Sequence, residues 1–349
     1  MRKEKKIRIG FTIGDLNGIG GELIIKTFED KRLLDFFTPV VYASIKSMSF
    51  LKQHFQSSIL FNEIPNANKA IDGKLNIVNV WKEQVAIVFG EETAEAGQYA
   101  LRSLKAAVEA LKTDQIQVLV TAPINKHNIQ SDAFQFPGHT DFLNQELEGN
   151  SLMFMISDSL RVGLLTDHVP VGEVPKHINE VLVSSKIDLI YQSLKSDFAI
   201  GTPKIAVLGI NPHTGDNGVI GSEDDTVLRP ALRKIKESGK LIYGPYAADS
   251  FFGSNNYQNF DAIVATYHDQ GLIPFKTLTF GNGVNYTAGL NKVRTSPDHG
   301  TAYDIAGEGI ANIDSFKEAI FTGLEIFKNR NMATVLNENP LQKQSKNRK

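Results

Sequence analysis

Three histidines each stand within three residues of the end of an apolar run, and together they could hold a metal ion. They are His168, His213 and His268. Ligands of open α/β sheets bind beyond the carboxyl ends of the strands, so we expect the three imidazoles to lie at one edge. Neutral imidazole is a common metal ligand, and a catalytic metal typically has three protein ligands and one open position. The pattern predicts a divalent-metal site, with three unrelated loop histidines as the alternative.

Carboxylates stand close to two of these histidines. Asp216 follows His213 by three positions, and Asp269 follows His268 directly. Each carboxylate could accept a hydrogen bond that fixes the tautomer of its histidine. The alternative is that each one caps a helix.

A second set of residues could bind an anion. His139 and Thr140 precede the helical pattern of residues 142–148, and free backbone N–H groups at a helix start can hold a phosphate or a carboxylate. The alternative for Thr140 is an ordinary N-cap. Lys126, at the end of the segment TAPINK, adds a cation shortly before this helix.

A third group lies in a Gly- and Asn-rich stretch that follows His268. It consists of Lys276, Asn285 and Arg294. Arginine binds carboxylates and phosphates through two parallel hydrogen bonds, so this group could clamp an anionic substrate. Taken singly, each cation would be an ordinary surface residue.

The segment of residues 14–22, GDLNGIGGE, is Gly-rich and lies between a predicted strand and a predicted helix. It matches neither the dinucleotide-binding pattern G-x-G-x-x-G nor the phosphate-binding pattern that ends in Gly-Lys-Ser/Thr. An anion site at the helix start and a simple tight turn are equally open.

Short apolar runs alternate with longer helical patterns, which predicts an α/β fold with a largely parallel sheet. The predicted strands are residues 7–13, 40–43, 77–80, 118–121, 152–156, 162–166, 205–210 and 262–266. The predicted helices are residues 20–28, 93–112, 178–194, 224–238 and 313–328. Residues 123–140 and 278–298 are interpreted as two crossings between lobes.

Composition narrows the class of protein. The chain has 349 residues, of which 37 are basic and 39 are acidic, and a net charge of −2. It therefore has no excess of positive charge that would attract a nucleic acid. It has no cysteine, which excludes disulfides and thiolate metal sites. No run approaches the roughly 20 apolar residues of a membrane span, so we expect a cytoplasmic protein. The polar tail of residues 337–349 is expected to be disordered.

Several segments together resemble the family of 4-hydroxythreonine-4-phosphate dehydrogenases, the NAD-dependent enzymes of pyridoxal phosphate biosynthesis. The segments are GDLNGIGGE, TAPINK, PGHTDFL, LTDHVPV, NPHTGDNGVIGSED, GPYAADSFF, YHDQGLIPFK and TSPDHGTAYDIAG. The likeness runs from residue 14 to about residue 307. It departs from the usual family pattern at Leu16, Asn17, Gly21 and Ala122, which leaves the fine shape of the cleft and the substrate open.

The resemblance implies a two-lobed α/β fold similar to that of isocitrate and isopropylmalate dehydrogenases, with the active site in the cleft between the lobes. We place the first lobe at residues 1–126 and about 296–336, and the second at residues 127–295. The resemblance also implies a homodimer whose site lies at the subunit interface and takes ligands from both subunits. NAD would be bound there without a dinucleotide-binding motif.

The resemblance assigns roles to the residues found above. The metal, a divalent ion such as Zn, Mg or Co, matches His168, His213 and His268. The substrate contacts match five residues, namely His139, Thr140, Lys276, Asn285 and Arg294. Lys276, Asp249 and Asp269 are the candidates for catalytic residues, and Lys276 or Asp249 is the candidate for proton transfer.

The implied reaction is the NAD- or NADP-dependent oxidation of 4-phosphooxy-L-threonine to a 3-oxo acid, which loses CO₂ to give 3-amino-2-oxopropyl phosphate. One alternative within the family is a dehydrogenase of D-threonate or D-erythronate 4-phosphate; other relatives act on aromatic dihydrodiols. Two alternatives outside it are a metal-dependent hydrolase or lyase without NAD, and a non-catalytic sugar-phosphate-binding protein.

Overall fold

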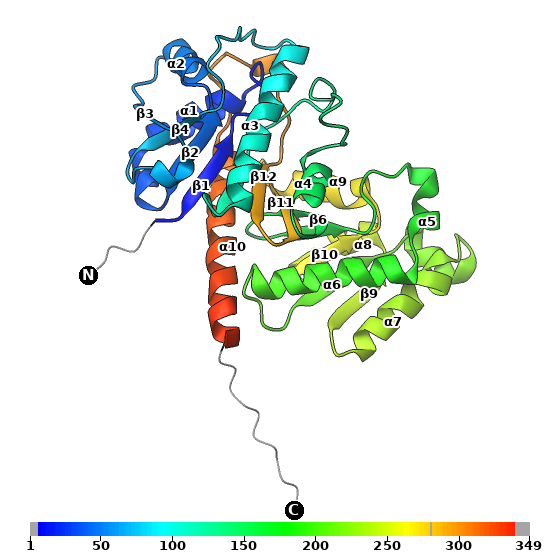
Figure 1. The fold of residues 1–349 in the computed structure, drawn as a ribbon. Coiled ribbons are helices and arrows are strands. Elements are labelled where there is room, and N and C mark those ends of the chain that lie inside the picture. Colours follow the sequence, from blue (N-terminus) through cyan, green and yellow to red (C-terminus); the bar gives the residue numbers. More distant parts are fainter. Residues whose placement is uncertain (1–5, 280, 339–349) are drawn as a thin grey trace, which may run out of the picture.

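One mixed sheet runs through the computed structural model, which describes residues 6–279 and 281–338 (Figure 1). Its twelve strands in the described residues have the order β3-β4-β2-β1-β5-β12-β11-β6-β7-β10-β8-β9. One half holds β1 (Arg8–Thr12), β2 (Thr38–Ala43), β3 (Phe61–Ile64), β4 (Leu75–Asn79) and β5 (Val118–Thr121). The other half holds β6 (Gly149–Ile156), β7 (Arg161–Leu164), β8 (Lys204–Leu208), β9 (Leu241–Tyr246) and β10 (Ala262–Ala265).

Two strands late in the chain, β11 (Val284–Leu290) and β12 (Val293–Pro297), join the halves. β12 pairs in parallel with β5, while β11 pairs antiparallel with both β12 and β6. Residues 278–298, interpreted from the sequence as a crossing between lobes, consist mostly of these two strands, neither of which was predicted. Polar residues occupy one face of both strands, so the segment lacks the apolar run of a strand that is buried on both sides. Its role as a crossing between lobes stays a prediction.

Helices cover both faces of the sheet, which confirms the predicted α/β fold class (Figure 1). The helices of the first half are α1 (Gly20–Glu29), α2 (Ile45–His54), α3 (Ala94–Lys112) and α4 (His139–Glu146). Those of the second half are α5 (Val174–His177), α6 (Glu180–Ser196), α7 (Arg229–Glu237), α8 (Ala248–Gly253) and α9 (His268–Thr279). Among the described residues, no helix is long and apolar enough to cross a membrane.

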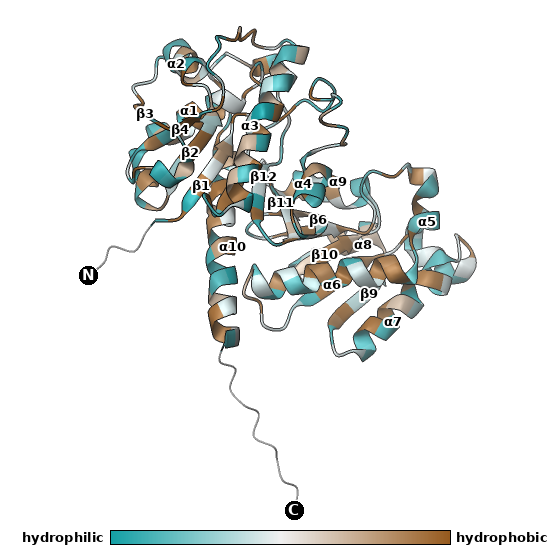
Figure 2. Ribbon diagram, viewed as in Figure 1, coloured by the Kyte–Doolittle hydropathy of each residue, from teal (hydrophilic) through white to brown (hydrophobic). Residues whose placement is uncertain are grey.

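The core has one continuous layer and two separate ones. On one face, apolar residues of α1, α6, α7 and α10 (Asp314–Glu338) form a single cluster that spans both halves. On the other face, α3 and α4 cover the first half, and α8 and α9 cover the second. Apolar and polar residues are interspersed along α6 and α7, as expected for helices with one buried side (Figure 2).

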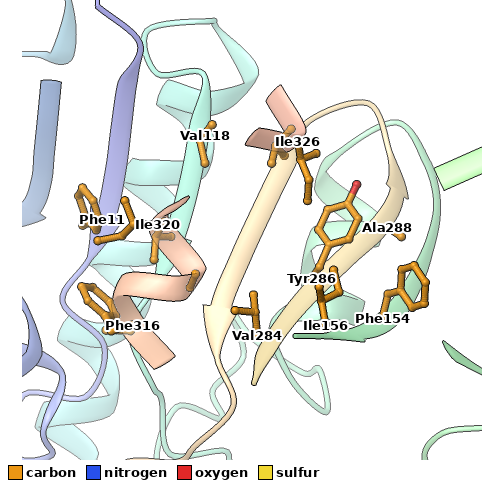
Figure 3. Packing of buried hydrophobic residues seen from close by; sticks show 14 of the residues in the cluster. Phe11, Val118, Phe154, Ile156, Val284, Tyr286, Ala288, Phe316, Ile320 and Ile326 are labelled. Atoms are coloured by element: carbon orange, nitrogen blue, oxygen red, sulfur yellow. The ribbon is translucent and has the colours of Figure 1, made fainter. Parts of the chain in front are cut away.

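The long helix α10 packs where the two halves meet. It contacts β5, β11 and β12. Phe316 of α10 lies against Phe11 of β1 with 5.9 Å between ring centroids, and both belong to the cluster drawn in Figure 3. Farther along, Arg330 donates to Asp197 (2.7 Å) and to the hydroxyl of Tyr286 (2.7 Å). The helix thereby connects the central strand β11 to the end of α6.

The predicted lobe boundaries stay a prediction. The predicted disordered tail lies, from residue 339 onward, outside the described residues, while residues 337 and 338 belong to α10.

Candidate active site

A cleft of about 310 Å³ opens over the central strands, on the face between the α3–α4 layer and the α8–α9 layer. Its floor consists of alternate residues of neighbouring strands. Asn285 of β11 is paired with Met155 of β6 on one side and with Ser296 of β12 on the other. Because side chains alternate along a strand, these residues share one face. The central strands thus present polar groups to the cleft and apolar groups to α10.

The walls come from the starts of two helices and the ends of several strands. Lining residues include Thr121, Lys126, His139, Thr140, His168, His268, Lys276, Arg294, Asp298 and His299. All five residues predicted to contact the substrate line this one cleft, together with two of the three predicted metal ligands. Asp249, Asp269 and His213 do not line it.

Arg294 lies at the base of the cleft and is only 2% exposed. Its Nε and one terminal nitrogen donate to the hydroxyl of Thr121 (3.1 and 2.6 Å), and its other terminal nitrogen donates to the hydroxyl of Thr287 (3.1 Å). Among the described residues no carboxylate pairs with it. Burial lowers its pKa from 12.5 to about 9, which still leaves the guanidinium charged at neutral pH. A buried, uncompensated cation is an anion receptor.

His139 is the first residue of α4, and Gly138 is the N-cap. Thr140 is therefore not the N-cap, which removes the structural alternative considered for it. Burial, with Arg294 and Lys126 nearby, lowers the pKa of His139 well below 6.5, so the ring is neutral at pH 7. Its Nε2 is buried without a hydrogen-bond partner among the described residues. A neutral ring with a free nitrogen suits a hydrogen bond to substrate.

Lys276 projects from α9 into the cleft, where its Nζ lies 3.3 Å from a carboxylate oxygen of Asp298. Burial raises the pKa of Asp298, although Lys276 opposes this effect. Next to it, His299 directs Nδ1 toward the carbonyl of Gly300 (3.2 Å), and its Nε2 is buried without a partner. Asp298 and His299 were not among the site residues predicted from the sequence, although the motif TSPDHG contains both.

His168 and His268 follow β7 and β10, which are neighbours in the sheet, and their ring centroids are 6.3 Å apart. His268 Nδ1 lies 2.7 Å from an Asp269 carboxylate oxygen, which accepts a hydrogen bond from the Nδ1–H tautomer and leaves Nε2 available for a ligand. This contact supports the predicted tautomer-fixing role of Asp269 over a direct role in the cleft. Two imidazoles that line the same cleft fit a divalent metal.

The third histidine is elsewhere. His213 is exposed in a turn of residues 212–218, where five successive residues from 213 to 217 have positive φ. Within the described residues, no group of three or more His, Asp or Glu side chains is close enough to hold a metal. The strand order offers a reason, because β8 lies beyond β10 and the turn after it leads away from the cleft. The single chain therefore supplies two of the three predicted ligands.

The Gly-rich loop of residues 14–22 contains two buried carboxylates of its own. Asp15 is fully buried and accepts from the Asn17 amide (2.9 Å) and from the side chain of Asn128 (2.7 Å). Glu22, in the first turn of α1, is also buried and pairs with Lys26. Two buried acids at this helix start disfavour an anion, so the structure favours the tight-turn interpretation.

Comparison with known proteins decides the family. The sequence profile described as "Pyridoxal phosphate biosynthetic protein PdxA" matches residues 35–323. The chain belongs to the PdxA family. It is similar to 4-hydroxythreonine-4-phosphate dehydrogenase of Bacteroides thetaiotaomicron, with 47% identity over 344 residues that cover 98% of this chain and 94% of the relative. The family resemblance predicted from the sequence is confirmed.

Another relative is named for a different substrate. The chain is similar to D-threonate 4-phosphate dehydrogenase of Cupriavidus necator, with 35% identity over 327 residues, 92% of this chain and 98% of that one. Its fold is similar to the crystal structure of 4-hydroxythreonine-4-phosphate dehydrogenase from Klebsiella pneumoniae, with a TM-score of 0.79 and 29% identity over 94% of this chain and 99% of that one. Members of this family are oxidoreductases that act on a hydroxyl group.

Proposed function

We propose that this chain oxidises the C3 hydroxyl of 4-phosphooxy-L-threonine with NAD or NADP, and that the resulting 3-oxo acid loses CO₂ to give 3-amino-2-oxopropyl phosphate. The observation that carries the proposal is that one cleft is lined by the buried and uncompensated Arg294, by Lys276 and by two imidazoles. A substrate with an anionic group at each end and a hydroxyl between them fits that arrangement. The name of the Bacteroides relative supports this substrate.

In this proposal the anionic ends of the substrate bind the cations of the cleft. Arg294 offers two unused N–H donors, and Asn285 carries a buried side-chain oxygen without a partner among the described residues. Neutral His139 adds a hydrogen bond rather than a charge. These contacts would hold the C3 carbon in one orientation, which is the main contribution of binding groups to such a reaction.

A divalent metal on His168 and His268 would lower the pKa of the substrate hydroxyl as a Lewis acid. Asp269 would hold the His268 ring in the tautomer that such a ligand needs. The nicotinamide cofactor would accept the hydride. The names of the relatives, which are dehydrogenases, support such a cofactor. The residue roles proposed above concern the substrate alone.

We assign proton transfer to Lys276, because its Nζ lies in the cleft against Asp298. In this step the unprotonated amine of Lys276 would accept the hydroxyl proton, and the Asp298 carboxylate would stabilise the resulting ammonium. After CO₂ leaves, a proton must return to C2, and the same pair can deliver it. Replacement of Lys276 by Met tests this assignment: unchanged turnover at saturating substrate would exclude it.

We further propose that the protein acts as a homodimer and that a second copy completes the metal site. An apolar groove of about 540 Å³ lies next to His268, lined among others by Asp249, Phe252, Tyr267, Ile273, Pro274 and Leu278. Ile273 is 63% exposed in the single chain. A partner seated there could bring its own His213 and Asp249 to this cleft, which would explain why both lie outside it here. Sedimentation velocity tests the dimer, and Ile273→Glu is expected to produce monomers.

The decisive experiment follows the near-ultraviolet absorbance of reduced nicotinamide. The protein is mixed with NAD or NADP and 4-phosphooxy-L-threonine, then with EDTA, then with Zn, Mg or Co restored. A rise that EDTA abolishes and metal restores would support substrate, cofactor class and metal dependence together. A flat trace under all conditions would refute the proposed substrate.

The second candidate is oxidation of D-threonate 4-phosphate, which the name of the Cupriavidus relative favours, or of D-erythronate 4-phosphate. These compounds carry a hydroxyl where 4-phosphooxy-L-threonine carries its amine. A metal that would bind the amine and the C3 hydroxyl of 4-phosphooxy-L-threonine would bind two hydroxyls of these compounds instead. The same assay, run on all three substrates, separates the candidates by kcat/KM. A hydrolase or lyase would consume substrate without any nicotinamide reduction.

A further inference from the structure

Three strands converge on the Arg294 guanidinium. Arg294 comes from β12, Thr121 ends β5, and Thr287 lies on β11 two positions beyond Asn285. Both threonines are fully buried, and their hydroxyls accept all three hydrogen bonds that the guanidinium makes in the described structure. Two of the three bonds end on Thr121, whose hydroxyl bridges Nε and one terminal nitrogen.

The count of donors shows which part of Arg294 is left for a ligand. A guanidinium carries five N–H groups in a rigid plane. The three bonds to Thr121 and Thr287 use the Nε–H and one N–H on each terminal nitrogen. One N–H therefore remains on each terminal nitrogen. These two remaining N–H groups, called here the fork, are donors that the oxygens of a carboxylate or a phosphate can bind.

The chemistry of the two partners preserves the charge of this fork. A hydroxyl accepts hydrogen bonds without neutralising the guanidinium, whereas a carboxylate would form an internal ion pair. The chain contains the contrasting case: the half-buried Arg330 lies against the buried Asp197, with 2.7 Å between Nε and a carboxylate oxygen, and this carboxylate neutralises its charge. Arg294 is held by neutral groups and keeps its charge for a ligand.

We propose that Thr121 and Thr287 are positioning residues: they lock the plane of the Arg294 guanidinium so that its free fork faces the cleft, and they leave its charge to a phosphate or carboxylate of the substrate. Their role follows from the anion site itself. The identity of the anion rests on the proposed function, so the two ideas are tested separately.

The test measures binding of inorganic phosphate to the full-length protein by isothermal titration calorimetry, without any nicotinamide or turnover. We expect Thr287→Val and Thr121→Val to weaken phosphate binding about tenfold each, which corresponds to about 1.4 kcal/mol. Thr287→Ser and Thr121→Ser, which keep the hydroxyl, are expected to stay within about twofold of the natural protein, because each retains the charge-assisted hydrogen bond. Arg294→Met sets the scale for complete loss of the site.

A matched control is available one residue from Arg294. Thr295 is also fully buried, but its hydroxyl donates to the carbonyl of Ala319 (2.7 Å) on the side of α10. Thr295→Val is expected to lower thermal stability while phosphate affinity stays at the natural value. This control separates a general loss of packing from loss of the two hydroxyls that hold the guanidinium.

The kinetic readout is a rise in KM for the phosphorylated substrate that exceeds the fall in kcat, because the anion contact exists in the ground state and the transition state alike. Unchanged phosphate affinity in both valine variants, or serine variants as weak as the valine variants, would overturn the positioning role. Should a valine variant fail to fold, the serine and alanine variants at the same position carry the comparison. Phosphate binding that follows this pattern without any nicotinamide reduction would refute the proposed function alone.

Discussion

Arg294→Met is expected to leave the stability of the folded protein nearly unchanged while it destroys the anion site. Arg294 is 2% exposed, and its pKa falls from 12.5 to about 9 through burial, which corresponds to roughly 5 kcal/mol of unfavourable folding free energy at neutral pH. Its three charge-assisted hydrogen bonds share two threonine hydroxyls, and at about 1.5–3 kcal/mol for each hydroxyl their loss removes about 3–6 kcal/mol of stabilisation. A methionine of similar length fills the same space, so the two effects nearly cancel and the variant should lie within about 2 kcal/mol of the natural protein.

The assay is thermal unfolding in a phosphate-free buffer and again with phosphate. Without phosphate, we expect the Tm of Arg294→Met to stay within a few degrees of that of the natural protein. With phosphate at 100 times its Kd, the natural protein should gain about 2.7 kcal/mol, because the ligand binds only the folded state. The variant should gain nothing.

The matched control is Arg330→Met, at a half-buried arginine that does have a carboxylate partner, the buried Asp197. Burial by itself would lower the pKa of Arg330, but Tyr286 and Asp197 outweigh burial and raise it. Removal of Arg330 leaves the Asp197 carboxylate buried and unpaired, so we expect a loss of about 3–5 kcal/mol. The reasoning would be refuted if Arg294→Met lost as much stability as Arg330→Met, or if phosphate stabilised Arg294→Met as strongly as the natural protein.

Three other predictions concern single residues. Asp269→Asn should weaken metal binding about 10- to 100-fold in equilibrium dialysis, because the second partner of a metal-bound imidazole fixes its tautomer; equal affinity would contradict that role. Burial lowers the pKa of His139 in the folded state, so the unfolded chain binds more protons below about pH 6.5 and stability falls as pH falls from there; His139→Gln should flatten that decline in urea titrations, and an unchanged slope would count against it. Gly97→Ala should lower Tm by several degrees, since its Cβ would lie 2.1 Å from the carbonyl oxygen of Asn128; an unaltered Tm would show that the loop yields.

Most of the strands could be found from the sequence because their signal is local. The predicted strand at residues 118–121 coincides with β5, and residues 7–13 contain β1. Both are short runs buried on both faces, and such runs depend on no distant partner for recognition. Four strands were missed, namely β3, β9, β11 and β12. Of these, β11 and β12 carry polar residues toward the cleft, so the residues that form the site interrupt the apolar pattern of a strand.

The sequence by itself also determined the chemistry that this protein has available. The absence of cysteine limits a metal site to imidazoles and carboxylates, and the family motifs brought together the five residues that line one cleft. Motifs record which residue types must be present. They do not record which of those residues one chain can bring within reach of one another.

Only the tertiary structure decided which of these residues lie close together and which lie apart. Sheet order put His168 and His268 on neighbouring strands and carried His213 away on the far side of β10. It also placed Thr121 and Thr287, separated by 166 positions in the sequence, on the same guanidinium. The reason is physical: hydrogen bonding between distant strands fixes which side chains meet, and no local pattern contains that information.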